Sequence, residues 1–170
     1  MSNDHVIWNP SSAFIEKTRI HHFMQQEGLI DYDALIKASR DPEWFWPRAL
    51  KHLGMLWDVP YHTLLDCSDG FPFAKWFTGG KLNIVRNCLD RHIEAGLSSK
   101  TAFVWESETG PTRHISYGEW QDEVARVANF LKSVGVKKGD RIGLYMPMIP
   151  EMVFALFAAF KIGAVIVGVS

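Results

Sequence analysis

Residues 114–170 restrict the fold more than any other part of the chain, because their pattern predicts helix, strand, helix and strand in close succession. Residues 141–146 and 164–169 are short apolar runs with little alternation, which is typical of strands covered on both faces of a parallel sheet. Residues 152–162 between them are long enough for the helix of a βαβ crossover, a connection that is almost always right-handed. The end of the chain is therefore predicted to open a parallel α/β sheet.

The first helix of this stretch carries a start signal and a stop signal. Ser116 and Glu119 have the S-x-x-E spacing of a capping box, in which each side chain satisfies a free backbone N–H group. Gly135 supplies a left-handed stop. Between them, apolar residues recur at helical spacing and predict one buried stripe. The stripe consists of Trp120, Val124, Val127, Leu131 and Val134.

The second helix, predicted at residues 152–162, is apolar nearly all round, so we expect protein on every side of it. Pro150 lies where a first-turn proline is tolerated, and Gly163 closes the helix. Lys161, Gly163 and the strand-forming residues that follow favour a buried βα unit over a membrane span. Two parallel strands bury neither this helix nor each other. We therefore expect the rest of a larger sheet to cover them.

The residues before this stretch form shorter elements rich in aromatic side chains. Start and stop signals predict four helices, at residues 12–26, 32–39, 42–53 and 81–94. Residues 101–106 and 112–116 flank a turn and predict a β-hairpin that leads into the Ser116 helix. The fold class is therefore α/β: a helical N-terminal cap, a β-hairpin and the first βαβ of a parallel sheet.

The clearest change of pattern falls at residues 96–100, between the aromatic-rich short helices and the regular α/β pattern. We predict a helical, aromatic-rich cap region at residues 1–96. Residues 97–170 are predicted to be the start of a larger α/β domain, truncated at Ser170. Because ligands of open parallel sheets sit at the carboxyl ends of the strands, we expect the ligand-binding turn to lie beyond this point.

The composition excludes several classes of protein. Hydrophobic residues make up 47% of the 170, enough for a real core, and the formal net charge is −1 with no basic patch, which argues against a nucleic-acid partner. Cys67 and Cys88 show neither a metal-binding spacing nor a disulfide framework, so a reduced, cytoplasmic setting is expected. The N-terminus has no signal-peptide pattern, and no membrane partner is predicted.

Known catalytic motifs are absent from the chain. It contains no G-x-G-x-x-G, Walker A, G-x-S-x-G or H-E-x-x-H pattern. Gly79-Gly80-Lys81 faintly resembles an anion-binding turn before a helix, although a tight aromatic-lined turn explains it better. Asp90-Arg91-His92 could form a catalytic trio, but a salt-bridge and hydrogen-bond network that fixes its helix is the favoured interpretation.

Several stretches taken together resemble the acetyl-CoA synthetases and related short-chain acyl-CoA synthetases of the AMP-forming adenylating superfamily. WFTGGKLN at residues 76–83 and NCLDRH at 87–92 resemble the N-terminal signature of that family. ISYGEW at residues 115–120 resembles its first core motif. The likeness continues through the segments 134–140, 142–151 and 161–165, while 44–46 and 53–57 fit the family's helical N-terminal region.

The resemblance implies a two-step reaction in the complete enzyme. A carboxylate attacks the α-phosphate of ATP with Mg²⁺ bound, and the thiol of CoA then attacks the acyl-adenylate. The family's phosphate loop, acidic metal ligands and mobile lysine have no counterpart in this sequence, so no catalytic residue and no metal ligand are assigned. Val169 and Ser170 are expected to adjoin the implied CoA channel. No ATP, CoA or Mg²⁺ is expected to bind this chain alone.

The expected function is therefore the N-terminal portion of an acid–CoA ligase, inactive alone, whose partners are the remaining large and C-terminal domains of the same enzyme. An alternative is a non-catalytic binding or scaffold subunit that pairs with a separately encoded catalytic half. A small Rossmann-type nucleotide binder is a weaker alternative, because prolines occupy the turn after the first parallel strand where glycines are needed.

Overall fold

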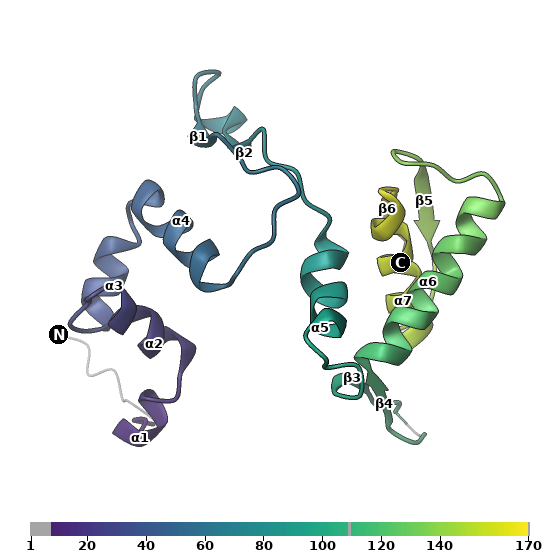
Figure 1. The fold of residues 1–170 in the computed structure, drawn as a ribbon, viewed down its shortest axis with the longest axis horizontal. Helices are drawn as coiled ribbons and strands as arrows, with labels where there is room; N and C mark the ends of the chain where they lie inside the picture. The colour runs from purple at the N-terminus through teal and green to yellow at the C-terminus, as the bar shows by residue number, and fades with distance from the viewer. Residues whose placement is uncertain (1–7, 109, 170) are drawn as a thin grey trace. The chain divides into compact units, whose positions relative to one another are not determined.

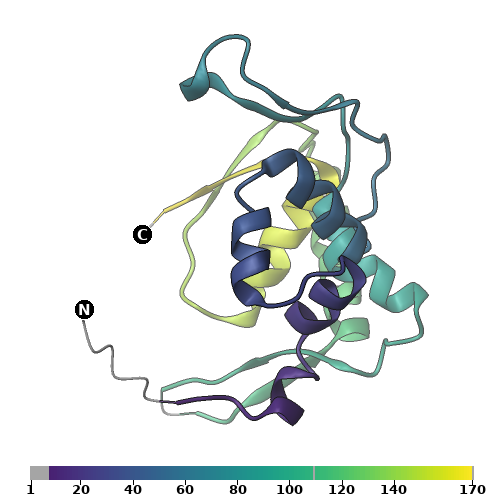
Figure 2. The same ribbon diagram turned by 90° about the vertical axis from the view of Figure 1, so that its left-hand side faces the viewer.

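The computed structural model describes residues 8–108 and 110–169 (Figures 1 and 2). Packing divides this chain into two compact units. The first contains the described residues up to Met55 together with His62–Thr78, and the second contains Leu56–Tyr61 and the residues from Gly79 onward. Within the described ranges, no helix is long and apolar enough to cross a membrane.

The first unit contains the short helices predicted for the N-terminal region. They are α1 (Ser12–Ile15), α2 (Arg19–Gln26), α3 (Tyr32–Ala38) and α4 (Pro42–His52). The prediction of a single helix at residues 12–26 is wrong, because the helix ends after Ile15 and a second helix begins after Thr18. The Thr18 hydroxyl accepts a bond from the amide of His21 at 3.2 Å and donates to the carbonyl of Ile15 at 2.7 Å, so it caps a new helix. The starts predicted at Asp31 and Asp41 are confirmed as N-caps.

Helices α2, α3 and α4 gather in one group in this first unit (Figures 1 and 2). Phe23 and Leu35 are buried, and the ring of Phe45 meets that of Phe23 edge to face at a centroid distance of 6.2 Å. The unit also holds an antiparallel pair, β1 (Thr63–Asp66) and β2 (Lys75–Thr78), joined through a 3₁₀ turn at Phe71–Phe73.

The helix predicted at residues 81–94, in the second unit, is shorter than predicted. Lys81 is held in a β-bridge with Val59, so the helical turns start only after Asn83. They continue as the π-helix η2 (Arg86–Asp90) and then as α5 (Arg91–Glu94). Val85 and Leu89 on this segment are fully buried.

The predicted hairpin and the helix after it are confirmed. Strand β3 (Thr101–Trp105) pairs antiparallel with β4 (Arg113–Ser116) and leads into α6 (Tyr117–Ser133). The Ser116 hydroxyl accepts a bond from the Glu119 amide at 3.1 Å, which is the first half of the predicted capping box. Val134 does not extend the buried stripe; it is exposed because it follows the last helical residue.

The βαβ unit at the end of the chain is also confirmed. Strand β5 (Arg141–Leu144) and strand β6 (Val165–Gly168) are parallel, and α7 (Pro150–Ile162) connects them. Helix α7 packs against α6, and the two contribute Trp120, Val124, Ala128, Phe154 and Ala158 to one core with Val85, Leu89 and Ile115.

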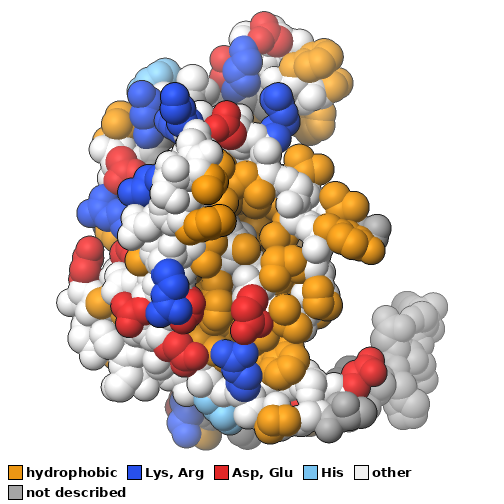
Figure 3. All heavy atoms as spheres, turned by 90° about the vertical axis from the view of Figure 1, so that its right-hand side faces the viewer, with side chains coloured by type: hydrophobic (Ala, Val, Ile, Leu, Met, Phe, Trp, Pro, Cys, Tyr) orange, Lys and Arg blue, Asp and Glu red, His pale blue; other side chains and the backbone are white. Residues whose placement is uncertain are grey.

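The outer part of this βαβ unit is more open than a strand pair buried on both faces. Val165 and Val167, two residues apart on β6, are both exposed. Tyr145 and Met148, beyond the end of β5, are exposed as well. Helix α7 buries Phe154 and other residues of one side, while much of its remaining surface is only half-buried. Figure 3 presents a face of the molecule on which hydrophobic side chains gather beside charged ones. Apolar surface of this kind is typical of an interface with further protein.

Candidate functional site at the carboxyl ends of the parallel strands

The edge at which a ligand is expected lies at the carboxyl ends of β5 and β6. The amide of Val169 donates to the carbonyl of Leu144 at 3.0 Å, so the two strand ends stay paired up to this point. The Val169 side chain is 51% exposed and lies at the predicted edge. Ser170, the other residue predicted to adjoin a CoA channel, lies outside the described residues. The cofactor role of both residues stays a prediction.

The turn after β5 is held in place by the hairpin. The indole Nε1 of Trp105 donates to the carbonyl of Met148 at 2.8 Å, and the Ile149 amide donates to the carbonyl of Pro147 at 2.8 Å. A shallow groove of about 360 Å³ runs between β3 and the start of α7. Its lining is mostly apolar and includes Phe103, Trp105, Met148, Pro150 and Val153. This lining suits an apolar group better than a phosphate.

The N-terminus of α7 points its free amides toward the same edge, but the protein's own carboxylate meets them. Glu151 in the first turn bonds its own backbone amide and the Arg113 guanidinium, which is 3.0 Å away. These two contacts, the amide first, lower the pKa of Glu151 from its ordinary value. Because a negative charge already compensates this helix end, it is a poor site for a second anion.

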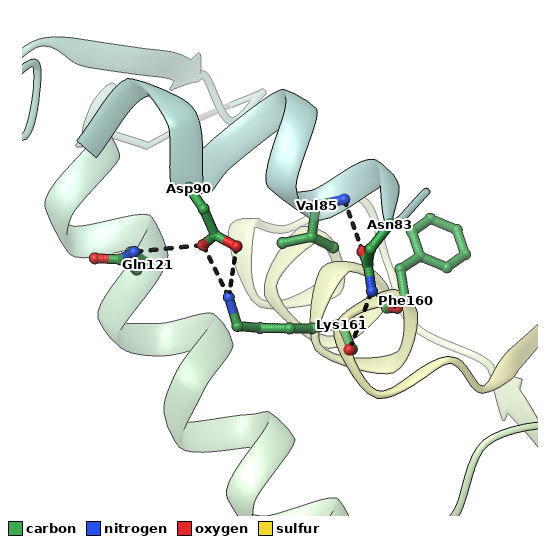
Figure 4. A network of polar contacts seen from close by, with 6 residues as sticks. All are labelled: Asn83, Val85, Asp90, Gln121, Phe160 and Lys161. Atoms are coloured by element: carbon green, nitrogen blue, oxygen red, sulfur yellow. Dashed lines mark hydrogen bonds and ion pairs between the residues drawn. The ribbon is translucent and has the colours of Figure 1, made fainter. Parts of the chain in front are cut away.

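Asp90 and His92 of the possible trio Asp90-Arg91-His92 contact different partners, and Figure 4 shows those of Asp90. The Asp90 carboxylate accepts two hydrogen bonds from the Lys161 ammonium, at 2.8 and 2.9 Å. The side-chain Nε2 of Gln121 donates to the same carboxylate at 3.4 Å. The His92 ring packs on Tyr117 at a centroid distance of 4.7 Å. The predicted network that fixes the helix is confirmed for Asp90, and it secures the far end of α7 instead of a reaction centre.

The glycine pair before Lys81 does not form an anion cradle. The Lys81 amide donates to Val59 at 2.8 Å, and no helix begins directly after the turn. Among residues 8–108 and 110–169, no three His, Cys, Asp or Glu side chains come together in a group that could hold a metal ion.

Two protein-family models match successive parts of the chain. The family model "Acetyl-coenzyme A synthetase N-terminus" matches residues 32–88, and the model "AMP-binding enzyme" matches residues 89–170. The acetyl-coenzyme A synthetase of Mycolicibacterium smegmatis is 46% identical over 128 residues, which are 75% of this chain and 13% of that protein. The acetyl-coenzyme A synthetase of Cupriavidus metallidurans is 40% identical over 161 residues, 95% of this chain and 23% of that protein.

A solved structure has a similar fold. The acetoacetyl-CoA synthetase of Streptomyces lividans superimposes with a TM-score of 0.83 at 27% identity, covering 95% of this chain and 26% of that one. The chain thus spans about a quarter or less of the length of the relatives it matches. Two family models in succession and relatives of 40–46% identity show that the chain belongs to the acetyl-CoA synthetase family of AMP-binding enzymes and corresponds to the N-terminal portion of its members.

Proposed function

We propose that this chain is the N-terminal portion of an AMP-forming acid–CoA ligase that converts acetate or another short-chain carboxylate, ATP and CoA to the acyl-CoA, AMP and pyrophosphate. The observation that carries the proposal is the match to an acetyl-coenzyme A synthetase over 95% of the chain. The relatives hold the matched region within one longer polypeptide. That arrangement favours a ligase over a scaffold subunit with a separately encoded catalytic half.

The proposed local role is structural. The polypeptide carries the cap region, residues 1–96, and the start of the large domain, residues 97–170, while ATP, Mg²⁺ and CoA bind mainly to residues supplied by the rest of the enzyme. Val169 and Ser170 would adjoin the CoA channel at the sheet edge. A cytoplasmic location fits the two free cysteines.

The partner of this chain, in the same proposal, is the remainder of the large domain together with the C-terminal domain. The exposed Val165 and Val167 support it, since a strand of a parallel α/β sheet is normally covered on both faces. The half-buried surface of α7 is a second part of this interface.

Exchange of labelled pyrophosphate into ATP, with and without acetate, tests the proposal. The 170-residue chain is expected to show no acetate-dependent exchange, whereas a native gene product that continues through the large domain is expected to show it. The intact mass of that gene product identifies which case applies. Robust exchange by the 170 residues alone would overturn the proposed incompleteness, and a longer gene product without exchange on any short carboxylate would overturn the ligase.

A further inference from the structure

Two polar contacts hold the last turn of α7 from one neighbouring segment (Figure 4). In the first, the Asn83 side-chain Nδ2 donates to the carbonyls of Phe160 and Lys161 at 3.1 and 3.2 Å. Its Oδ1 accepts the amide of Val85 at 3.0 Å. The final carbonyls of a helix have no partner within the helix. One amide side chain therefore caps the end of α7 and the start of the η2 segment together.

The second contact lies nearby. Lys161, on the same last turn, points back to Asp90 and reaches both carboxylate oxygens within 2.9 Å. The pair is largely shielded, with side-chain exposures of 34% and 24%. Gln121 of α6 completes the contact at 3.4 Å. A shielded, hydrogen-bonded pair of this kind holds geometry more firmly than an exposed one.

The turn that these contacts hold leads directly into β6. Gly163 closes α7 with a φ of +77°, and a Cβ at this position would lie 3.0 Å from the side chain of Lys138, so the turn has little room to shift. Strand β6 follows at once, with the Val165 amide bonded to the Asp140 carbonyl at 2.8 Å. The strand then runs to Val169 at the carboxyl edge. Any movement of the α7 end is therefore passed to the strand, whose register controls which face each side chain occupies.

We propose that Asn83 and the Asp90–Lys161 pair are positioning residues that fix the register and the carboxyl end of β6. The functional part of this inference rests on the proposed ligase activity. There, the pair acts through the strand end on the step that involves CoA, and it touches no reacting group. Neither contact is needed to build the α6–α7 core, which is apolar.

Hydrogen exchange on the full chain tests the positioning directly. Asn83→Asp keeps the acceptor for Val85 but removes the donor to α7, and Asp90→Asn removes the charge that holds Lys161. We expect the Val169 amide to exchange about tenfold faster or more in either variant, with β3–β4 amides unchanged, because local opening is governed by local contacts. Glu123→Gln is the matched control, since the ion pair that Glu123 forms among the described residues is with Arg126, one turn away on α6.

Uniform acceleration across β3, β4 and β6 would reduce the contacts to general stabilisation and overturn the inference. No change at Val169 would overturn it as well. Lys161→Arg, which keeps the charge, is expected to restore most of the protection that Lys161→Met loses.

The ligase assay separates this inference from the proposed function. In the active gene product, Asn83→Asp and Asp90→Asn are expected to raise the KM for CoA several-fold while acetate-dependent pyrophosphate exchange stays near the wild-type rate. An equal fall in both half-reactions contradicts the positioning role. If the wild-type gene product lacks ligase activity, the proposed function fails, and the exchange of Val169 still decides whether these residues fix the strand.

Discussion

Phe154 provides the sharpest test of the packing between α6 and α7. Phe154 is 4% exposed in the core of the second unit, and the centroids of its ring and the Phe103 ring are 6.4 Å apart. Truncation of a buried phenylalanine removes its transfer free energy and leaves a cavity, at a cost of about 3–5 kcal/mol. We expect Phe154→Ala to lower the free energy of unfolding by about 4 kcal/mol, a large part of the roughly 5–15 kcal/mol available to a domain.

Phe130 supplies the matched control. It is the same residue type on the neighbouring helix α6, but its side chain is 62% exposed. Both substitutions change helix propensity by the same small amount, so that contribution cancels in the comparison. We expect Phe130→Ala to change the free energy of unfolding by less than about 1 kcal/mol, as for most surface positions.

Brief proteolysis across a urea series measures both variants, with mass spectrometry of peptides from α6 and α7 as the readout. With a slope near 2 kcal/mol/M, the midpoint should fall by about 2 M for Phe154→Ala and by less than about 0.5 M for Phe130→Ala. Where the alanine variant is too unstable to accumulate, Phe154→Leu should still shift the midpoint measurably. Equal shifts at the two positions would refute the packing described for α7.

Three further outcomes are expected. Gly163→Ala should lower the free energy of unfolding, measured by thermal unfolding, by about 1–2 kcal/mol, because Gly163 has a positive φ and lies close to the Lys138 side chain. Gly143→Ala should lower it less, because the space around Gly143 is open. Equal losses at the two positions would contradict this expectation. Because the pKa of Glu151 is lowered in the fold, its carboxylate stabilises the fold at pH values above its ordinary pKa of 4.5, and this contribution is lost as the pH falls through the folded pKa. Glu151→Gln should therefore reduce the acid dependence of the free energy of unfolding by a few tenths of a kcal/mol at this exposed site. An unchanged dependence of stability on acid pH would count against the contact with Arg113. Val165→Thr with Val167→Thr should reduce light scattering by the isolated chain, and a fully monodisperse wild-type chain would remove the basis for this expectation.

Local signals account for the parts of the fold that the sequence predicted well. Ser116, Asp31 and Asp41 start helices through bonds to amides two or three residues away, so their role is visible in a short window. The order of β5, α7 and β6 follows from apolar runs and from the proline and glycine at the ends of the helix. These features depend little on the rest of the chain.

Other features depend on residues distant in sequence, and the sequence did not predict them. The helix predicted from Lys81 starts late because the Lys81 backbone forms a β-bridge with Val59, more than twenty residues earlier. Asn83 bonds carbonyls 77 and 78 residues away, and a lone asparagine before a helix gives no sign of such a partner. The candidate edge at Val169 was predictable as a position in a parallel sheet, and we propose that side chains from the remainder of the enzyme complete it.

The meeting point of the two family models shows why the cap and the sheet must be considered together. One model ends at Cys88 and the other begins at Leu89, which places the junction inside the π-helix η2. Val85 before the junction and Leu89 after it are both fully buried in the core that α6 and α7 form. A boundary in sequence similarity is thus not a boundary in packing here. Residues of the N-terminal signature help to bury and hold the crossover helix, so substitutions in that signature are expected to act on β6, the strand that leads to the candidate edge.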